Sequence, residues 1–147
     1  MTEKKIKNIF IQGAITSQFI ADSIAKHSSK KDIGAHSIFL GQIRNDVIDG
    51  QEVVAIEYSS YEEMALEKMH TIREQIFEKY TLTCMHVYHS VGKVHTGEIS
   101  LFVFTSSIHR KEAIEACTEI VEQIKNELPI WGKEIFVAGD YVWKENK

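Results

Sequence analysis

The spacing of apolar residues predicts two long helices and one short helix. Residues 62–80 and 110–128 place apolar side chains three and four positions apart, which is the spacing of an amphipathic helix. A shorter helix is predicted around residues 19–25, where Thr16 or Ser17 can cap the first turn. Pro129 ends the last helix, because proline lacks an N–H group and disfavours helical geometry in the residue before it.

β-Branched and aromatic residues predict strands at residues 8–12, 33–43, 53–58, 84–91 and 99–105, and a short strand within residues 137–143. Asp49-Gly50 is typical of a turn, so the second and third strands are expected to form a hairpin. Gly92 and Gly97 bracket the connection between the next two strands, which are expected to pair. This order predicts an α+β fold, with a mixed or antiparallel sheet and packed helices in a single domain spanning residues 1–147.

Composition narrows the class of protein. The chain has 147 residues, a formal net charge of −4 and 44% hydrophobic residues, which is typical of a globular domain. A pI near 6.0 argues against a nucleic-acid-binding protein, and no apolar run is long enough to cross a membrane. The Lys-rich start is not followed by the apolar stretch of a secretory signal. Two cysteines, Cys84 and Cys117, are too few for a disulfide framework, so a cytoplasmic location is expected.

Cationic side chains gather at both ends of the helix predicted at residues 110–128. His109 and Arg110 stand at its start, after Ser106-Ser107, where free backbone N–H groups and the helix dipole favour an anion. The serines can equally cap the helix and leave Arg110 solvated. Lys125 lies at the other end, on the border of the apolar stripe. It is either a lysine whose stem covers apolar surface, or a partly desolvated lysine whose lowered pKa suits a nucleophile or general base.

No metal site is expected. His86, His89 and His95 surround one connection, but strand residues three apart point to opposite faces, so His86 and His89 cannot ligate the same ion. The sequence also lacks a phosphate-binding Gly-Lys-Ser/Thr loop, a Gly-x-Ser-x-Gly elbow and a Gly-x-Gly-x-x-Gly motif.

Several segments taken in order resemble the large, catalytic subunit of molybdopterin synthase, the MoaE family. The segments are Phe39-Leu40-Gly41-Gln42-Ile43-Arg44-Asn45, Glu57-Tyr58, His89-Ser90-Val91-Gly92-Lys93, Ser107-Ile108-His109-Arg110, Ile124-Lys125, Pro129-Ile130-Trp131-Gly132-Lys133-Glu134 and Gly139-Asp140 with Val142-Trp143. The resemblance covers most of the chain and implies an α+β fold.

The resemblance also implies a function. Enzymes of this family convert a cyclic pyranopterin monophosphate into molybdopterin, without a cofactor. They take sulfur from the C-terminal Gly-Gly thiocarboxylate of a small ubiquitin-like subunit. The large subunits form a homodimer within a heterotetramer, and both protomers contribute to the pterin pocket.

Carried over by position, the resemblance assigns catalysis to Lys125 and Lys133. It assigns substrate binding to these two lysines and to Gln42, Ile43, Arg44, His109, Arg110, Gly132 and Glu134. A phosphate and a thiocarboxylate are both anions, so a cationic pocket is needed to hold them close together.

One departure from the family leaves an alternative open. Many relatives carry a second catalytic lysine directly after the tryptophan, where this chain has Gly132. Either Lys133 substitutes for it or the site works with one lysine. The departure favours a rival function, a non-catalytic scaffold that docks a ubiquitin-like protein. A phosphatase-like enzyme is a further rival, but the sequence offers none of the paired carboxylates or metal ligands that it needs.

Overall fold

The computed structural model describes residues 6–145, which form three helices and eight strands within that range. In chain order these are β1 (Phe10–Gln12), α1 (Ser17–Ala25), β2 (Ala35–Gln42), β3 (Val47–Ile48), β4 (Gln51–Ser60), α2 (Glu62–Lys79), β5 (Cys84–His95), β6 (Ile99–Ser107), α3 (Arg110–Glu127), β7 (Ile130–Phe136) and β8 (Tyr141–Trp143). The predicted α+β class is confirmed.

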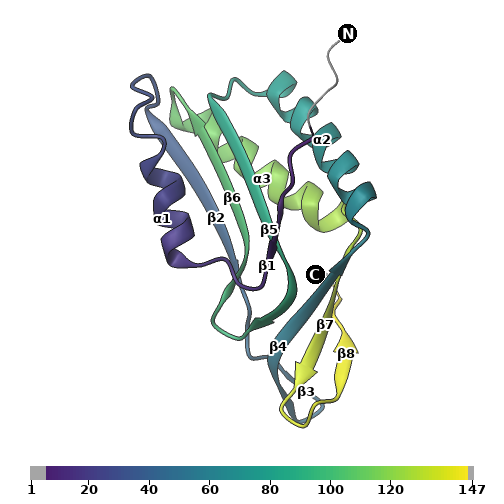
Figure 1. Cartoon of the computed structure of the whole chain (residues 1–147). Coiled ribbons are helices and arrows are strands. Elements are labelled where there is room, and N and C mark those ends of the chain that lie inside the picture. Colours follow the sequence, from purple (N-terminus) through teal and green to yellow (C-terminus); the bar gives the residue numbers. More distant parts are fainter. Residues whose placement is uncertain (1–5, 146–147) are drawn as a thin grey trace.

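The strands form one sheet in the order β2-β6-β5-β4-β7-β8, in which every neighbouring pair is antiparallel. β1 adds a parallel pairing to β5, and β3 pairs with β4. Figure 1 shows α1 on one face of the sheet and α2 and α3 on the other. The strands β4, β7 and β8 extend from the lower end of this layered part.

The two faces of β6 explain why the layers hold together. Leu101 and Val103 pack with Ile120 and Ile124 of α3, in the larger apolar cluster. Phe102 and Phe104 belong to a second cluster, with Phe19 and Ile20 of α1 packed against it. A strand buried on both faces is apolar almost throughout, and this is the pattern that the sequence of residues 99–105 shows.

The helix boundaries agree closely with the sequence predictions. Thr16 caps α1 by accepting a hydrogen bond from the backbone N–H of Phe19. The alternative in which Ser106 or Ser107 caps α3 is wrong. His109 holds the N-cap position without a side-chain bond, the Ser107 hydroxyl donates to the His109 carbonyl, and Ser106 pairs with the ring of His36.

Two strand predictions are corrected. β2 and β4 do not form a hairpin, because β2 pairs with β6 while β4 pairs with β5 and β7; the turn at Asp49-Gly50 joins β3 to β4. Gly92 does not end a strand, since β5 runs through it to His95. Gly92 has a φ of 82°, a conformation that glycine adopts readily, and it lets β5 bend between its two halves.

The sequence also gave no expectation for β7. Residues 130–136 form a strand between β4 and β8, directly after Pro129 ends α3. Their buried positions alternate at Gly132, Glu134 and Phe136. Two of these inward positions hold a glycine and a glutamate, so the sequence lacks the alternation of apolar and polar residues that predicts a strand. Within residues 6–145, no helix is both long and apolar enough to cross a membrane.

Candidate active site

Lys125 lies in the last turn of α3 and is half-buried. Burial is the main cause that lowers the pKa of its ammonium, and the nearby charge of Lys144 lowers it further. A lysine with a lowered pKa holds more of the neutral amine at pH 7 than an exposed lysine. The sequence left two interpretations of Lys125, a lysine whose stem covers apolar surface and a partly desolvated, reactive lysine. The lowered pKa supports the second.

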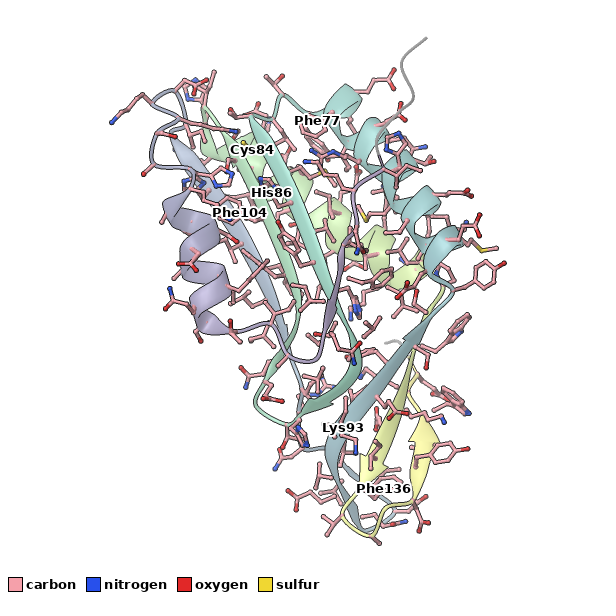
Figure 2. All side chains as sticks on the ribbon, viewed as in Figure 1. Phe77, Cys84, His86, Lys93, Phe104 and Phe136 are labelled. Atoms are coloured by element: carbon pink, nitrogen blue, oxygen red, sulfur yellow. The ribbon has the colours of Figure 1, made fainter. Side chains whose placement is uncertain are left out.

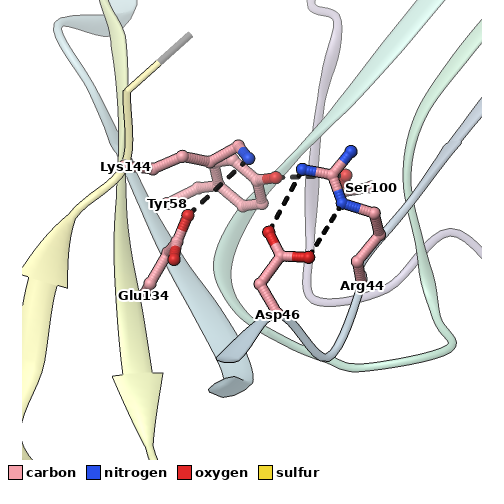
Figure 3. A network of polar contacts seen from close by, with 6 residues as sticks. All are labelled: Arg44, Asp46, Tyr58, Ser100, Glu134 and Lys144. Carbon is pink, nitrogen blue, oxygen red and sulfur yellow. Dashed lines mark hydrogen bonds and ion pairs between the residues drawn. The ribbon is translucent and has the colours of Figure 1, made fainter. Parts of the chain in front are cut away.

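Lys144 reaches the site from the residue after β8. The register pairs Lys133 with Trp143, so Lys144 stands opposite Gly132, and its backbone N–H donates to the Gly132 carbonyl over 2.8 Å. Its ammonium lies 3.7 Å from Oε1 of Glu134. Figure 3 shows this ion pair beside Tyr58 and Arg44. The chain thus places a second lysine near Lys125.

Gly132 is the position that makes this arrangement possible. A Cβ atom at Gly132 would lie 2.8 Å from Cγ2 of Ile56, closer than packed atoms normally approach, and in contact with the Tyr58 ring at 3.4 Å from Cε1. A side chain is therefore poorly accommodated here. Directly opposed residues of antiparallel strands share one face of the sheet, so the Lys144 side chain lies on the Gly132 face.

Lys133 lies on the other face of β7. Its ammonium stands 4.6 Å from the ring centre of Tyr141 and 5.2 Å from that of Trp143, a cation–π arrangement. Side chains alternate along a strand, so a shift of one residue from Gly132 reverses the direction of the side chain. The structure thus supports Lys144 rather than Lys133 as the lysine beside Lys125.

Buried polar residues line the base of the site. Glu134 is 6% exposed, and its Oε2 atom has no hydrogen-bond partner among the described residues. The Tyr58 hydroxyl lies 3.3 Å from that of Ser100, and burial raises the pKa of Tyr58. The Tyr58 ring meets the edge of His89 at 5.0 Å between centres.

His89 is neutral at pH 7. Burial lowers the pKa of its imidazole to about 4, and the charge of Lys125 contributes in the same direction. Its Nδ1 atom lies 2.8 Å from the Ser90 carbonyl, to which it donates. The positive charges of the site therefore come from lysine and arginine side chains and not from His89.

The segment that contains Gln42, Ile43 and Arg44 leaves the end of β2 beside this site. Gln42 is exposed, after a bulge at Gly41/Gln42, whereas Ile43 is 4% exposed and packs with Ile56, Tyr58 and Val94. The Arg44 guanidinium donates two bonds to Asp46, at 3.1 and 3.2 Å. That pairing is the main cause that raises the pKa of Arg44, and Glu134 adds to it.

Within one protomer, His109 and Arg110 lie far from Lys125 and the residues around it. They stand at the N-terminal end of α3, where they line a shallow pocket with Lys111, Ile114 and Glu115. Lys125 stands in the last turn, and 1.5 Å of rise per residue separates Arg110 from it by about 22 Å along the axis. The structure thus divides the predicted site residues into two groups.

Sequence reasoning missed Lys144, although one signal in the sequence could have found it. Gly139-Asp140 can mark a hairpin turn, and a hairpin about this turn sets residue 144 opposite residue 132. Together, Lys125, Lys144 and Arg44 can hold anionic groups, while the lowered pKa of Lys125 suits proton transfer.

Comparison with known families and proteins gives a consistent result. The family described as MoaE protein matches residues 14–127. A molybdopterin synthase catalytic subunit from Pyrococcus abyssi is 34% identical over 126 residues, covering 86% of this chain and 83% of the relative. One from Drosophila grimshawi is 39% identical over 135 residues, covering 90% of this chain. This chain spans 37% of the length of that relative and 31% of the Drosophila willistoni protein.

Solved structures share the fold. Molybdopterin synthase from Staphylococcus aureus aligns with a TM-score of 0.81 at 28% identity, over 96% of this chain and 99% of the other. The complex of subunits 1 and 2 of the molybdopterin-converting factor from Helicobacter pylori aligns with a TM-score of 0.79 at 20% identity, over 94% of this chain and 90% of the other.

Two histidines with lowered pKa values predict a loss of stability in acid. His86 and His89 each have a pKa lowered to about 4 in the folded chain, so between pH 6.5 and 4 the unfolded chain binds protons that the folded chain does not. The free energy of unfolding should fall as the pH falls through this range, by at most about 1.4 kcal/mol per pH unit for the buried His89 and by less for the partly exposed His86. His89→Phe should make the slope shallower, as measured by urea unfolding at pH 6.5 to 4.5, with the exposed His95→Phe as control. Equal slopes in wild type and His89→Phe would contradict the prediction.

Proposed function

Because this chain belongs to the MoaE family, we propose that it is the catalytic subunit of a molybdopterin synthase. It converts a cyclic pyranopterin monophosphate into molybdopterin, using sulfur from the C-terminal thiocarboxylate of a small ubiquitin-like partner. The observation that carries this proposal is the pair of lysines, Lys125 and Lys144, beside the buried Glu134.

The lysine pair suits a reaction between two anions. The phosphate of the pterin and the thiocarboxylate of the partner repel each other, and adjacent ammonium groups offset that repulsion. Sulfur bonds to a pterin carbon as the bond from that carbon to oxygen breaks. Water then hydrolyses the resulting thioester, which leaves the sulfur on the pterin and a carboxylate on the partner.

Lys125 is the acid–base group in this scheme. Its lowered pKa eases the transfer of a proton to the departing oxygen, because a weaker hold on the proton is what a general acid needs. Lys144 keeps its ammonium beside Glu134 and binds the anions. With Lys144 present, Gly132 no longer argues for a scaffold that has lost catalysis.

The distance between the two groups of site residues supports a homodimer. Arg110 and Lys125 occupy opposite ends of α3, so a pocket containing both takes them from different protomers. Within residues 6–145, β2 is an edge strand of the sheet, and it exposes Ile38, Phe39 and Leu40 by 37–41%. An unpaired apolar edge is a surface that a second copy can cover. We assign the dimer contact to this edge.

The small partner is proposed to dock beside the lysine pair, which completes a heterotetramer. Trp131, Tyr141 and Trp143 are 51–54% exposed around Lys133, and Trp143 directly precedes Lys144. Exposed aromatic residues are favoured at protein interfaces. Cytoplasmic location is part of the same proposal, in keeping with Cys84 and Cys117, which are both free and buried.

The proposed reaction is tested with purified protein, cyclic pterin monophosphate and the thiocarboxylated partner. Lys125→Ala should lower the rate of dithiolene formation by about 100- to 10,000-fold, because it removes the acid–base group. Lys68→Ala, at an exposed lysine of α2, is the matched control and should keep the wild-type rate. Wild-type protein that binds the partner yet forms no product would instead establish the scaffold.

Substitutions of the two candidate second lysines should differ in effect. Lys144→Ala should lower kcat by roughly 100-fold, the order of magnitude for losing one donor to a developing charge, whereas Lys133→Ala should alter kcat little. Removal of the Lys144 charge should also raise the pKa of Lys125, so the part of the pH–rate profile that depends on Lys125 moves to higher pH. Lys144→Arg keeps the charge and should keep the profile. A larger loss in Lys133→Ala than in Lys144→Ala would overturn the assignment.

Mixed dimers test whether the site combines two protomers. Lys125→Ala and Arg110→Ala should each be inactive alone. After the two are unfolded and refolded together, about a quarter of wild-type activity should return, because half of the dimers are mixed and each holds one intact site. Refolding each variant by itself is the control. No recovery in dimers shown to be mixed would place both residues in one protomer's site.

A further inference from the structure

A second cluster of chemically active side chains lies between α1 and the sheet, and the proposed reaction does not use it. His27, in the turn after α1, faces Cys84 and His86 of β5. One ligand atom from each of these three residues lies within 4.8 Å of the others. Figure 2 shows Cys84 and His86 close together on β5, at the end of the sheet next to α1.

The sequence argument against a metal site considered one connection alone. It was correct that His86 and His89 point to opposite faces, since His86 meets His27 and Phe104 while His89 meets Tyr58. The missing ligand comes from His27, far away in sequence. Cys84 and His86, two apart, share a face of β5.

The hydrogen bonds set the tautomer of His27. Nδ1 of His27 donates to the Ser23 carbonyl over 2.8 Å, because a carbonyl oxygen can only accept. The lone pair of the neutral ring therefore lies on Nε2, which is 3.0 Å from Nε2 of His86. A histidine that donates its second ring N–H to a carbonyl is the usual arrangement of a metal ligand.

We propose that His27, Cys84 and His86 form a site for one Cu(I) ion, held by two imidazole nitrogens and one thiolate sulfur. Metal–nitrogen bonds of about 2.0 Å and metal–sulfur bonds of about 2.3 Å set ligand atoms about 3.3–3.8 Å apart, so Cys84 has to approach by about 1 Å. The thiol proton leaves to solvent, the Nε2 proton of His86 moves to Nδ1, and no electron is transferred.

Charge selects a monovalent ion. Three cationic side chains, Lys7, Lys30 and Arg73, lie near enough to act on His86. The Lys30 ammonium donates to the Cys84 sulfur over 2.9 Å. Cu(I) with one thiolate and two neutral rings leaves no net charge among these cations, whereas Zn²⁺ leaves one positive charge. Thiolate ligands suit both ions in other respects.

One ligand of the cluster borders a surface pocket. A pocket lined by Lys7, His70, Arg73 and Tyr88 also contains His86, so this ligand borders the surface. Lys30 is exposed, and its ammonium can leave the sulfur for solvent when the ion binds. Both features place the cluster close to solvent.

The test is a copper competition with the whole, reduced protein under anaerobic conditions. Wild type should withdraw one equivalent of Cu(I) from the chelator bicinchoninate. Loss of a residue that only supports a ligand typically weakens metal binding by about 10- to 100-fold. Cys84→Ser and His27→Gln remove ligands themselves, so each should weaken Cu(I) binding by more than this. Cys117→Ser and His95→Gln are the controls, because each changes a cysteine or a histidine outside the cluster. Both should bind Cu(I) like wild type.

Two further readouts keep the proposal falsifiable if a variant fails to fold. X-ray absorption of copper-loaded wild type should show one sulfur and two nitrogen neighbours. In parallel titrations Zn²⁺ should be held more weakly than Cu(I). No copper retained by wild type, copper without a sulfur neighbour, retention unaffected in folded Cys84→Ser, or a preference for Zn²⁺ would each overturn the proposal.

Discussion

The continuity of β5 through Gly92 is the constraint on which the rest of the structure depends. Before this glycine, β5 pairs with β1 and β6 under the helices, and after it β5 pairs with β4. β4 in turn holds β7, and β7 holds β8. A positive φ at Gly92 thus brings the C-terminal hairpin to the end of α3, where Lys144 meets Lys125.

The lysine pair has an electrostatic cost that the surrounding residues reduce. Two ammonium groups near each other repel, and burial of Lys125 adds a desolvation cost. Glu134, buried below them, stabilises Lys144 directly and acts on Arg44 from a distance. An acidic chain therefore maintains a cationic surface at one place, which is where anionic substrates are proposed to bind.

The two clusters on opposite faces of β5 rely on the same alternation of side chains. Cys84 and His86 face α1, whereas His89 faces the site near Lys125. Burial of His89 and partial burial of His86 lower the pKa of both rings, and within residues 6–145 His86 alone of the two has another imidazole within bonding distance. One strand thereby contributes to two chemically distinct places without their sharing a residue.

Predictions from sequence succeeded where a single periodic element decided the outcome. The bounds of α2 and α3, the course of β6 and the place of Lys125 at the edge of an apolar stripe all follow from spacing along one segment. Predictions failed where two segments had to be placed relative to each other, as in the supposed pairing of β2 with β4 and in the absence of any expectation for β7.

The sequence by itself therefore determined the α+β class, the helices and the candidate role of Lys125. Only the tertiary structure decided that Lys144 lies opposite Gly132, that Lys133 points to the other face, and that His27 joins Cys84 and His86. The physical reason is that local spacing fixes which way a side chain points from its own element. Strand register and layer packing fix which other side chains it meets, and both depend on contacts between residues far apart in the chain.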